Sequence, residues 1–190
     1  MFYRFVKLIF TIYFRVFHRV YAKGGENVPD SGGLIICANH IHWLDPILLG
    51  VCTKRQIHFM AKAELFKNKF FALIVRGING FPVKRGTADI SAIKTSLRLI
   101  KSGKILGIFP EGTRSRNGKM LPPLPGVGLI VIKSKVPVVP IKISGNYGIF
   151  RTLRVTIGKP VSFDEYIGRK LNSSEVSEVS MSIMDRISIL

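Results

Sequence analysis

The sequence has few cysteines, few acidic residues and no long uninterrupted apolar run. Its two cysteines, Cys37 and Cys52, are too few for a disulfide framework, and Cys37 lies in an apolar segment typical of a buried, reduced thiol. The sequence contains no Cys/His cluster with zinc spacing and no Gly-x-x-x-x-Gly-Lys phosphate loop. We therefore expect no metal and no nucleotide cofactor, so the side chains must supply any chemistry.

Acidic residues are outnumbered, because 29 Lys and Arg stand against 11 Asp and Glu, giving a formal net charge of +18. Such an excess favours an anionic partner such as nucleic acid, lipid headgroups or an acidic protein. The mean hydropathy of +0.28 is high for so charged a chain and is more typical of a membrane-surface protein. Since no nucleic-acid-binding module signature is present, we expect an anionic membrane surface as partner and no nucleic acid.

Residues 1–21 contain no glycine, proline or acidic residue and predict one amphipathic helix. At 100° per residue, its polar side chains fall within an arc of about 120° and most aromatic and aliphatic ones lie elsewhere. The polar set is Arg4, Lys7, Thr11, Arg15, His18 and Arg19. The apolar set is Phe2, Phe5, Ile9, Ile12, Phe14 and Phe17.

This segment is too interrupted to cross a bilayer. Its longest stretch without a charge, residues 8–14, is far shorter than the roughly 20 apolar residues that a spanning helix needs, and no signal-peptide cleavage pattern follows it. We expect residues 1–22 to lie on the cytoplasmic face of the cell membrane, as a peripheral or monotopic segment. The alternative is a helix that packs its apolar face on the protein core.

Residues 23–190 alternate between predicted strands and helices. Strands are predicted at 34–38, 56–61, 78–83, 105–109, 138–143 and 153–157. Helices are predicted at 46–52, 68–76, 87–101, 126–133 and 174–189. This alternation predicts a single α/β domain with a mixed, mostly parallel sheet flanked by helices.

His40 and Asp45 follow the predicted strand 34–38, at the sheet edge where open α/β sheets bind ligands. Residues five apart in a regular helix point about 140° away from each other, so a turn must bring the two together. Asp45-Pro46 fits a helix start with the aspartate as cap. The same carboxylate is then able to hold one nitrogen of His40 and leave the other as a general base. Alternatively, Asp45 only caps the helix and His40 only satisfies loop backbone.

Two further polar clusters follow predicted strands. In the first, Glu111, Thr113 and Arg114 offer a carboxylate, a hydroxyl and a guanidinium, and Gly112 permits close backbone approach, as in a headgroup pocket. In the second, Lys84-Arg85 stands just before the predicted helix 87–101, where a phosphate can bind. The alternative for either cluster taken alone is a solvated basic surface.

Together these segments resemble the four motifs of the glycerolipid acyltransferases. Asn39-His40 with Asp45 resembles their His-x-x-x-x-Asp motif, and residues 109–115 match their Phe-Pro-Glu-Gly-Thr-Arg-Ser motif at every position. Residues 81–85 resemble the arginine-bearing motif between them, and residues 136–140 resemble the apolar fourth motif. The four motifs stand in the order expected for this family, and the sequence most resembles bacterial 1-acyl-sn-glycerol-3-phosphate acyltransferases, which convert lysophosphatidic acid to phosphatidic acid.

The resemblance implies a role for each motif. His40 is the base that takes the proton from the free glycerol hydroxyl, and Asp45 supports it. Arg85 and the loop residues Glu111, Gly112, Thr113 and Arg114 lie at the glycerol phosphate, to which we add Lys84 from its place in the sequence. Residues 136–140 belong to the acyl-donor side or the core. Acyl-CoA or acyl carrier protein is the donor, and no cofactor is needed.

Other functions remain open at this point. Relatives with similar motifs acylate glycerol 3-phosphate or other lysolipids. A thioesterase or serine hydrolase would need a nucleophile, for which Ser115 is a candidate by proximity, although no Gly-x-Ser-x-Gly elbow is present. A noncatalytic basic protein that binds membrane or nucleic acid would account for the charge but not for His40, Asp45 and Glu111.

Overall fold

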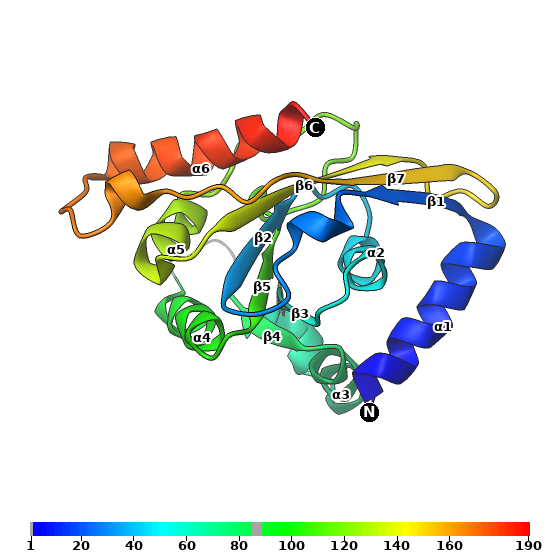
Figure 1. The fold of residues 1–190 in the computed structure, drawn as a ribbon. Helices are drawn as coiled ribbons and strands as arrows, with labels where there is room; N and C mark the ends of the chain where they lie inside the picture. The colour runs from blue at the N-terminus through cyan, green and yellow to red at the C-terminus, as the bar shows by residue number, and fades with distance from the viewer. Residues whose placement is uncertain (1, 85–88) are drawn as a thin grey trace.

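The computed structural model describes residues 2–84 and 89–190 (Figure 1). Within them, seven strands form one sheet in the order β1-β7-β6-β2-β5-β3-β4. Strands β6 and β7 are antiparallel, and all other neighbouring strands in this sheet are parallel. The prediction of an α/β domain with a mixed, mostly parallel sheet is therefore confirmed.

The bounds of the elements agree closely with the predicted segments after residue 23. The strands are β1 Arg19–Lys23, β2 Leu34–Ala38, β3 Ile57–Lys62, β4 Gly80–Val83, β5 Ile105–Ile108, β6 Val138–Gly145 and β7 Thr152–Ile157. The helices are α1 Phe2–Phe17, α2 Asp45–Cys52, α3 Lys69–Gly77, α4 Ile90–Lys101, α5 Gly126–Ser134 and α6 Ser173–Ser188, with short 3-10 turns η1 Gly25–Asn27, η2 Ala63–Phe66 and η3 Asp164–Tyr166. The first two residues of the predicted helix 87–101 lie outside the described residues.

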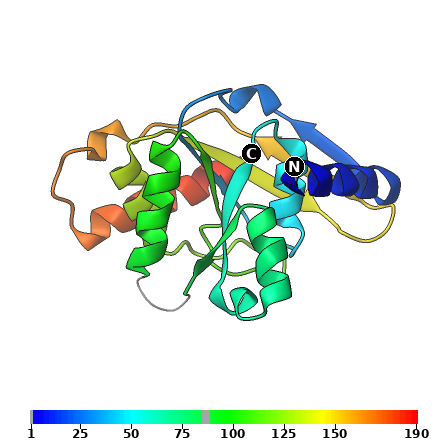
Figure 2. The ribbon, with the colours of Figure 1, turned by 90° about the horizontal axis from the view of Figure 1, so that it is seen from below.

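Helices cover both faces of the sheet (Figures 1 and 2). Helices α1, α2 and α3 lie on one side and α4, α5 and α6 on the other, as right-handed crossovers between parallel strands require. Strand β2 is central, and all five of its residues are buried between the two helix layers. Such a strand reads as a continuous apolar run rather than an alternating one.

The sheet changes its winding direction between β2 and β5, which are neighbours. The chain leaves β2 through α2 toward β3 on one side, whereas it leaves β5 through α5 toward β6 on the other side. The carboxyl ends of two such strands open a crevice, and open α/β sheets bind ligands there. Ala38 and Ile108 end these two strands, so the His40 and Glu111 segments both begin at this crevice.

The prediction of one helix over residues 1–21 is wrong in its last part. Helix α1 ends at Phe17, and Arg19–Lys23 form the edge strand β1, parallel to β7. The backbone N–H of Arg19 donates to the carbonyl of Arg151, which lies in the loop before β7. Local periodicity cannot register this pairing, because the partner strand lies about 130 residues further along the chain.

Helix α1 is turned so that much of its apolar side faces outward. Phe14 is buried against the core, but Phe5, Leu8 and Ile12 are 61%, 58% and 55% exposed. The predicted cationic arc is divided, because Lys7 donates to a carbonyl of the protein body and His18 is buried, whereas Arg4 and Arg15 remain exposed. Among the described residues, no helix has both the length and the apolar character needed to cross a membrane.

Candidate active site

The structure brings His40 and Asp45 together at the carboxyl end of β2. The distance from His40 Nδ1 to Asp45 Oδ2 is 2.8 Å, and the Asp45 side chain is fully buried. The same oxygen accepts hydrogen bonds from the backbone N–H groups of Ile41, at 2.7 Å, and His42, at 2.8 Å. A carboxylate that receives these donors requires the proton on Nδ1 of His40, so Nε2 is left as the basic nitrogen.

Asp45 does not cap helix α2, which corrects one expectation. Leu44 occupies the N-cap position, and Asp45 is the first residue of the helix, followed by Pro46. Its carboxylate points back to the preceding loop, where it accepts from the partly buried N–H groups of Ile41 and His42. The negative charge still lies at the N-terminus of α2, where the helix dipole stabilises it.

Glu111 connects the loop after β5 to the His40 backbone through hydrogen bonds. Its Oε1 accepts from the N–H of His40 at 2.7 Å, its Oε2 accepts from the N–H of Leu121 at 2.8 Å, and the residue is buried. The N–H of Ser115 in turn donates to the His40 carbonyl at 2.8 Å. Both backbone groups of His40 are therefore held by the Glu111 loop, which gives this carboxylate a structural role beside the dyad.

Aromatic rings fix the plane of the His40 imidazole. The ring stacks on Phe109 with a centroid distance of 4.1 Å and an interplanar angle of 21°. Phe109 stacks in turn on Phe59 of β3, at 5.6 Å. The side chain of His40 is 12% exposed, and within the described part of the chain Nε2 makes no hydrogen bond. The imidazole is thus held by Phe109 on one face and by Asp45 at Nδ1, and Nε2 is free to meet a substrate.

The rest of the Glu111 loop lies at the same edge. Gly112 has a φ of +65°, and a Cβ there would stand 2.4 Å from Leu124 Cδ1, so only glycine fits without strain. Thr113 and Arg114 are exposed. Burial lowers the pKa of His42, the negative charge of Asp45 opposes this shift, and the positive charge of Arg114 lowers the pKa further. Thr113 and Arg114 thus belong to the loop whose Glu111 and Ser115 contact the His40 backbone.

Lys84 and Arg85 are placed differently. Lys84 follows β4 and is exposed, and its backbone N–H donates to Asp89, the N-cap residue of α4. Strand β4 is three strand spacings from β2 in the sheet order, or about 14 Å. The structure thus places Lys84 at the same sheet edge but away from His40, and Arg85 lies outside the described residues. Residues 138–140 of the fourth motif are buried in β6 beside β2.

Ser115 is not arranged as a nucleophile. Its hydroxyl donates to Asn117 Oδ1 at 3.2 Å, and its backbone N–H rather than its hydroxyl contacts His40. Among the described residues, no hydroxyl or thiol is hydrogen-bonded to the His40 ring. A serine hydrolase would need such a contact, so this geometry disfavours the hydrolase alternative.

Tyr147 is the site residue that the sequence did not reveal. Its hydroxyl donates to Asp45 Oδ1 at 2.5 Å, and its ring stacks on His42 with a centroid distance of 4.1 Å. Burial raises the pKa of Tyr147, and the negative charge of Asp45 raises it further. The available signal was its place just after β6, the strand beside β2, although a lone tyrosine in a hairpin loop carries no motif.

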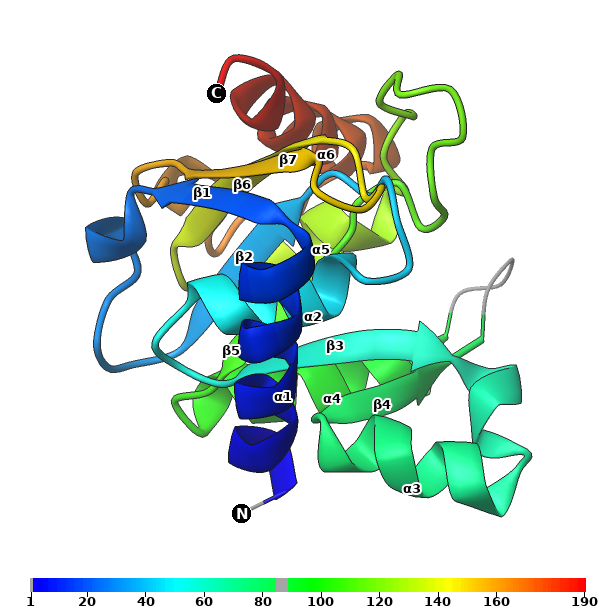
Figure 3. The ribbon, with the colours of Figure 1, turned by 90° about the vertical axis from the view of Figure 1, so that its right-hand side faces the viewer.

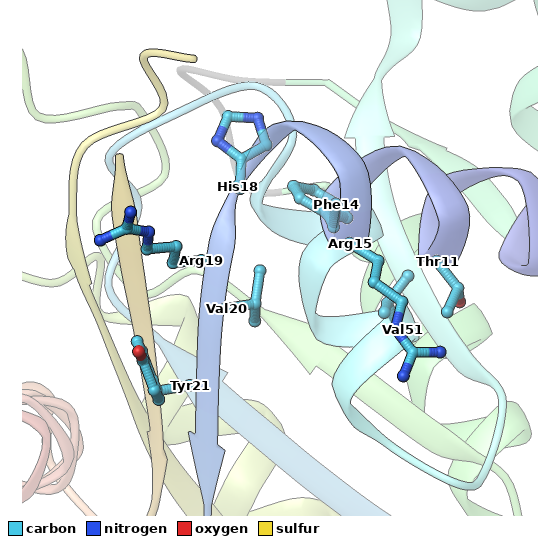
Figure 4. A pocket seen from close by; sticks show the side chains of 8 residues that line it. All are labelled: Thr11, Phe14, Arg15, His18, Arg19, Val20, Tyr21 and Val51. Atoms are coloured by element: carbon cyan, nitrogen blue, oxygen red, sulfur yellow. The ribbon is translucent and has the colours of Figure 1, made fainter. Parts of the chain in front are cut away.

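An open hollow lies apart from the dyad, between α1, β1 and α2 (Figure 4). It has a volume of about 420 Å³ and is lined in part by Thr11, Arg15, Arg19 and Tyr21. The guanidinium groups of Arg15 and Arg19 therefore lie near the C-terminal end of α1. In the part of the chain that the structure describes, no three His, Cys, Asp or Glu side chains converge as metal ligands.

The contact between Glu111 and the His40 backbone leads to a prediction. Glu111→Gln replaces one acceptor oxygen by an NH₂ group that must face a backbone N–H, and this conflict costs about 1–3 kcal/mol. We expect a melting temperature lower by several degrees and a kcat lower by about tenfold or more, because His40 is displaced. Glu64→Gln, at an exposed position in η2, is the control. Wild-type stability of Glu111→Gln would contradict the structural role.

An imidazole oriented by a buried carboxylate at the switch point of an open α/β sheet is typical of enzyme sites that use a general base. Residues 19–144 match the Acyltransferase family, and the chain belongs to this family. The resemblance inferred from the four motifs is thereby confirmed.

The names of similar proteins agree with membership of this family. The chain is 39% identical over 149 residues to a 1-acyl-sn-glycerol-3-phosphate acyltransferase of Bacillus subtilis (strain 168), with 75% of this chain and 73% of the relative covered. A protein of the same name from Streptococcus pneumoniae is 29% identical over 192 residues, with 96% and 70% covered. The crystal structure of the LPA acyltransferase PlsC from Thermotoga maritima superposes with a TM-score of 0.75 at 25% identity, covering 98% of this chain and 79% of that one.

Proposed function

We propose that this protein transfers a fatty acyl group from a thioester to the sn-2 hydroxyl of 1-acyl-sn-glycerol 3-phosphate, giving phosphatidic acid. The observation that carries the proposal is the 2.8 Å contact between His40 and Asp45, joined to the Glu111 loop at the crevice between β2 and β5. The names of the relatives support this choice of acceptor.

The reaction is a direct transfer in which His40 is the base. Nε2 takes the proton of the acceptor hydroxyl as its oxygen attacks the thioester carbonyl, while Asp45 stabilises the imidazolium that forms. The tetrahedral intermediate collapses by breaking the carbon–sulfur bond, and the thiolate receives the proton from Nε2. General-base assistance of this kind contributes about 10² to 10⁴ in rate, and no acyl-enzyme intermediate is required.

Cationic side chains supply the anion binding that both substrates need. Arg114 and the hydroxyl of Thr113 contact the acceptor phosphate beside His40, while Lys84 draws phosphate groups to the same edge of the sheet. Arg85 shares this phosphate-binding role in the proposal because it follows Lys84 in the sequence. The net charge of +18 also attracts an acidic donor, either acyl-CoA or acyl carrier protein.

One assay tests the acceptor and the reaction class together. Purified protein is incubated with a labelled acyl thioester, on CoA or on carrier protein, and with 1-acyl-sn-glycerol 3-phosphate, glycerol 3-phosphate, a lysophosphatidylcholine or no acceptor. We expect labelled phosphatidic acid as the main product. Release of free fatty acid without any need for an acceptor would indicate a thioesterase, and acylation of another lysolipid would replace the acceptor proposed here.

The enzyme works at the cytoplasmic face of the cell membrane, bound peripherally through α1. This helix exposes Phe5, Leu8 and Ile12 together with Arg4 and Arg15, a combination that suits the boundary between headgroups and acyl chains. Arg15 and Arg19, which line the open hollow, add positive charge near the C-terminal end of α1 (Figure 4). Each cation near an anionic leaflet contributes about 1 kcal/mol.

Helix α3 extends this apolar surface. The ring of Phe2 packs against Gly77, where a Cβ would lie 2.3 Å from its Cδ1, so the start of α1 and the end of α3 are side by side (Figures 1 and 3). On α3 only Ala72 is buried, and Phe70, Phe71 and Leu73 are exposed. Lys67, Lys69 and Arg76 accompany them. The two helices offer one apolar and cationic surface to an anionic bilayer.

Vesicle sedimentation tests this surface. Phe5→Ser with Leu8→Ser and Ile12→Ser should weaken binding to phosphatidylglycerol vesicles at least tenfold, because about 0.8 kcal/mol is lost per buried methylene. Phe70→Ser with Leu73→Ser should weaken it by a smaller factor. Met181→Ser, which changes an exposed apolar residue on α6, is the control and should bind as the wild type does. Unchanged binding of the α1 variant would contradict the membrane assignment.

A further inference from the structure

The Tyr147 hydroxyl reaches Asp45 from outside the loop that joins β2 to α2. The four donors to this buried carboxylate are divided between its oxygens. Oδ2 accepts from His40 Nδ1 and from two backbone N–H groups of the same loop, whereas Oδ1 accepts from Tyr147 Oη. Without Tyr147, Oδ1 would lose the hydrogen bond that the structure gives it, and the carboxylate would lose a restraint on its rotation.

The position of the Tyr147 ring is fixed by packing. It stacks on His42 with an interplanar angle of 17° and makes edge contacts with Phe14, at 6.5 Å, and with His18, at 6.2 Å. Phe14 belongs to α1 and His18 follows it directly. The hydroxyl therefore reaches the carboxylate already oriented, and the contacts run without interruption from α1 to Asp45.

We infer that Tyr147 is a positioning residue for acyl transfer, which fixes the Asp45 carboxylate and through it the His40 ring, and which links this pair to the packing of α1. The inference rests on the proposed function, in which His40 is the base. Because Tyr147 acts through Asp45 and not on the substrate, its hydroxyl affects kcat and the tautomer of His40 but not the KM for the acceptor.

The effect on His40 follows from the groups around it. Without the Tyr147 donor, the Asp45 carboxylate keeps its donors on Oδ2 alone, so it is freer to rotate and holds the Nδ1–H of His40 less firmly. The titratable and charged groups that face this site are Asp45, Tyr147, His42, His18, Glu111 and Arg114. Tyr147→Phe alters one neutral donor among them and leaves every formal charge in place.

The kinetic test compares Tyr147→Phe with Tyr13→Phe. Tyr13 belongs to the same aromatic cluster, but its hydroxyl lies 3.3 Å from His18 Nε2 and does not contact Asp45. We expect Tyr147→Phe to lower kcat by about tenfold and to leave the acceptor KM unchanged. Tyr13→Phe should keep the wild-type kcat and KM. Equal effects of the two variants would overturn the inference.

A second measurement needs no substrate, so it separates this inference from the proposed function. In protein with ¹⁵N-labelled histidine, the His40 resonances are assigned by NMR from their absence in His40→Gln, and the shifts of the two ring nitrogens report which of them carries the proton. We expect the proton on Nδ1 in the wild type and a measurable population with the proton on Nε2 in Tyr147→Phe. An unchanged tautomer would overturn the inference, even if the protein proves to be an acyltransferase. A changed tautomer in a protein without acyltransferase activity would refute the proposed function alone.

Discussion

His40→Ala lowers kcat for acyl transfer by about 10² to 10⁴, the range that a positioned general base contributes. The variant loses the ring whose Nδ1 is held by Asp45, and with it the Nε2 atom proposed as the base. The measurement is single-turnover transfer of a labelled acyl group from its thioester to 1-acyl-sn-glycerol 3-phosphate.

The same variant should fold normally. The backbone of His40 is held by Glu111 and Ser115 through its N–H and carbonyl, and neither contact involves the ring. Circular dichroism and vesicle binding should therefore match the wild type. His58→Ala is the matched control, because His58 lies near the amino end of β3, away from the site. Turnover of His40→Ala above a tenth of the wild-type value would remove His40 from its proposed role.

The sequence was sufficient to predict that the His40 and Glu111 motifs lie at one edge of the sheet. The β-branched runs at 34–38 and 105–109 have no strong alternative to strands, and in the structure they become neighbours in the sheet. Since both run parallel, the motifs that follow them must meet at one edge. This placement needs only the order and direction of the strands.

Features that depend on distant partners were not predictable in the same way. Residues 19–23 have a sequence pattern compatible with a helix but form a strand that pairs with β7. Tyr147 matters only because the loop after β6 folds over Asp45, about 100 residues away in the chain. Local pattern and propensity carry no information on either pairing.

The direction of the Glu111 side chain was not predictable from its motif. A carboxylate beside Thr113 and Arg114 was expected at the glycerol phosphate, yet both of its oxygens accept from backbone N–H groups. A motif fixes the type of residue but not the direction of its side chain. The same is true of Asp45, whose carboxylate was expected to cap α2 and instead closes the loop that precedes it.

Replacing Asp45 in two ways separates its charge from its hydrogen bonds. In Asp45→Asn, the amide oxygen is still able to accept from His40 and the two loop N–H groups, and the NH₂ group is able to donate to the Tyr147 hydroxyl, which then accepts. We expect a loss of stability of only about 1–2 kcal/mol. The neutral amide cannot stabilise an imidazolium, so kcat should fall by about 10³ to 10⁴.

Asp45→Ala removes the acceptors as well as the charge, and it leaves buried donors without partners. Each such donor costs about 1–3 kcal/mol, so we expect a loss of at least 3 kcal/mol and a melting temperature lower by about 6–12 °C. Thermal unfolding followed by circular dichroism, together with the transfer assay, measures both effects. If the asparagine variant were as active as the wild type, the charge of Asp45 would not assist the reaction. If the alanine variant were as stable as the wild type, the loop before α2 would not depend on this carboxylate.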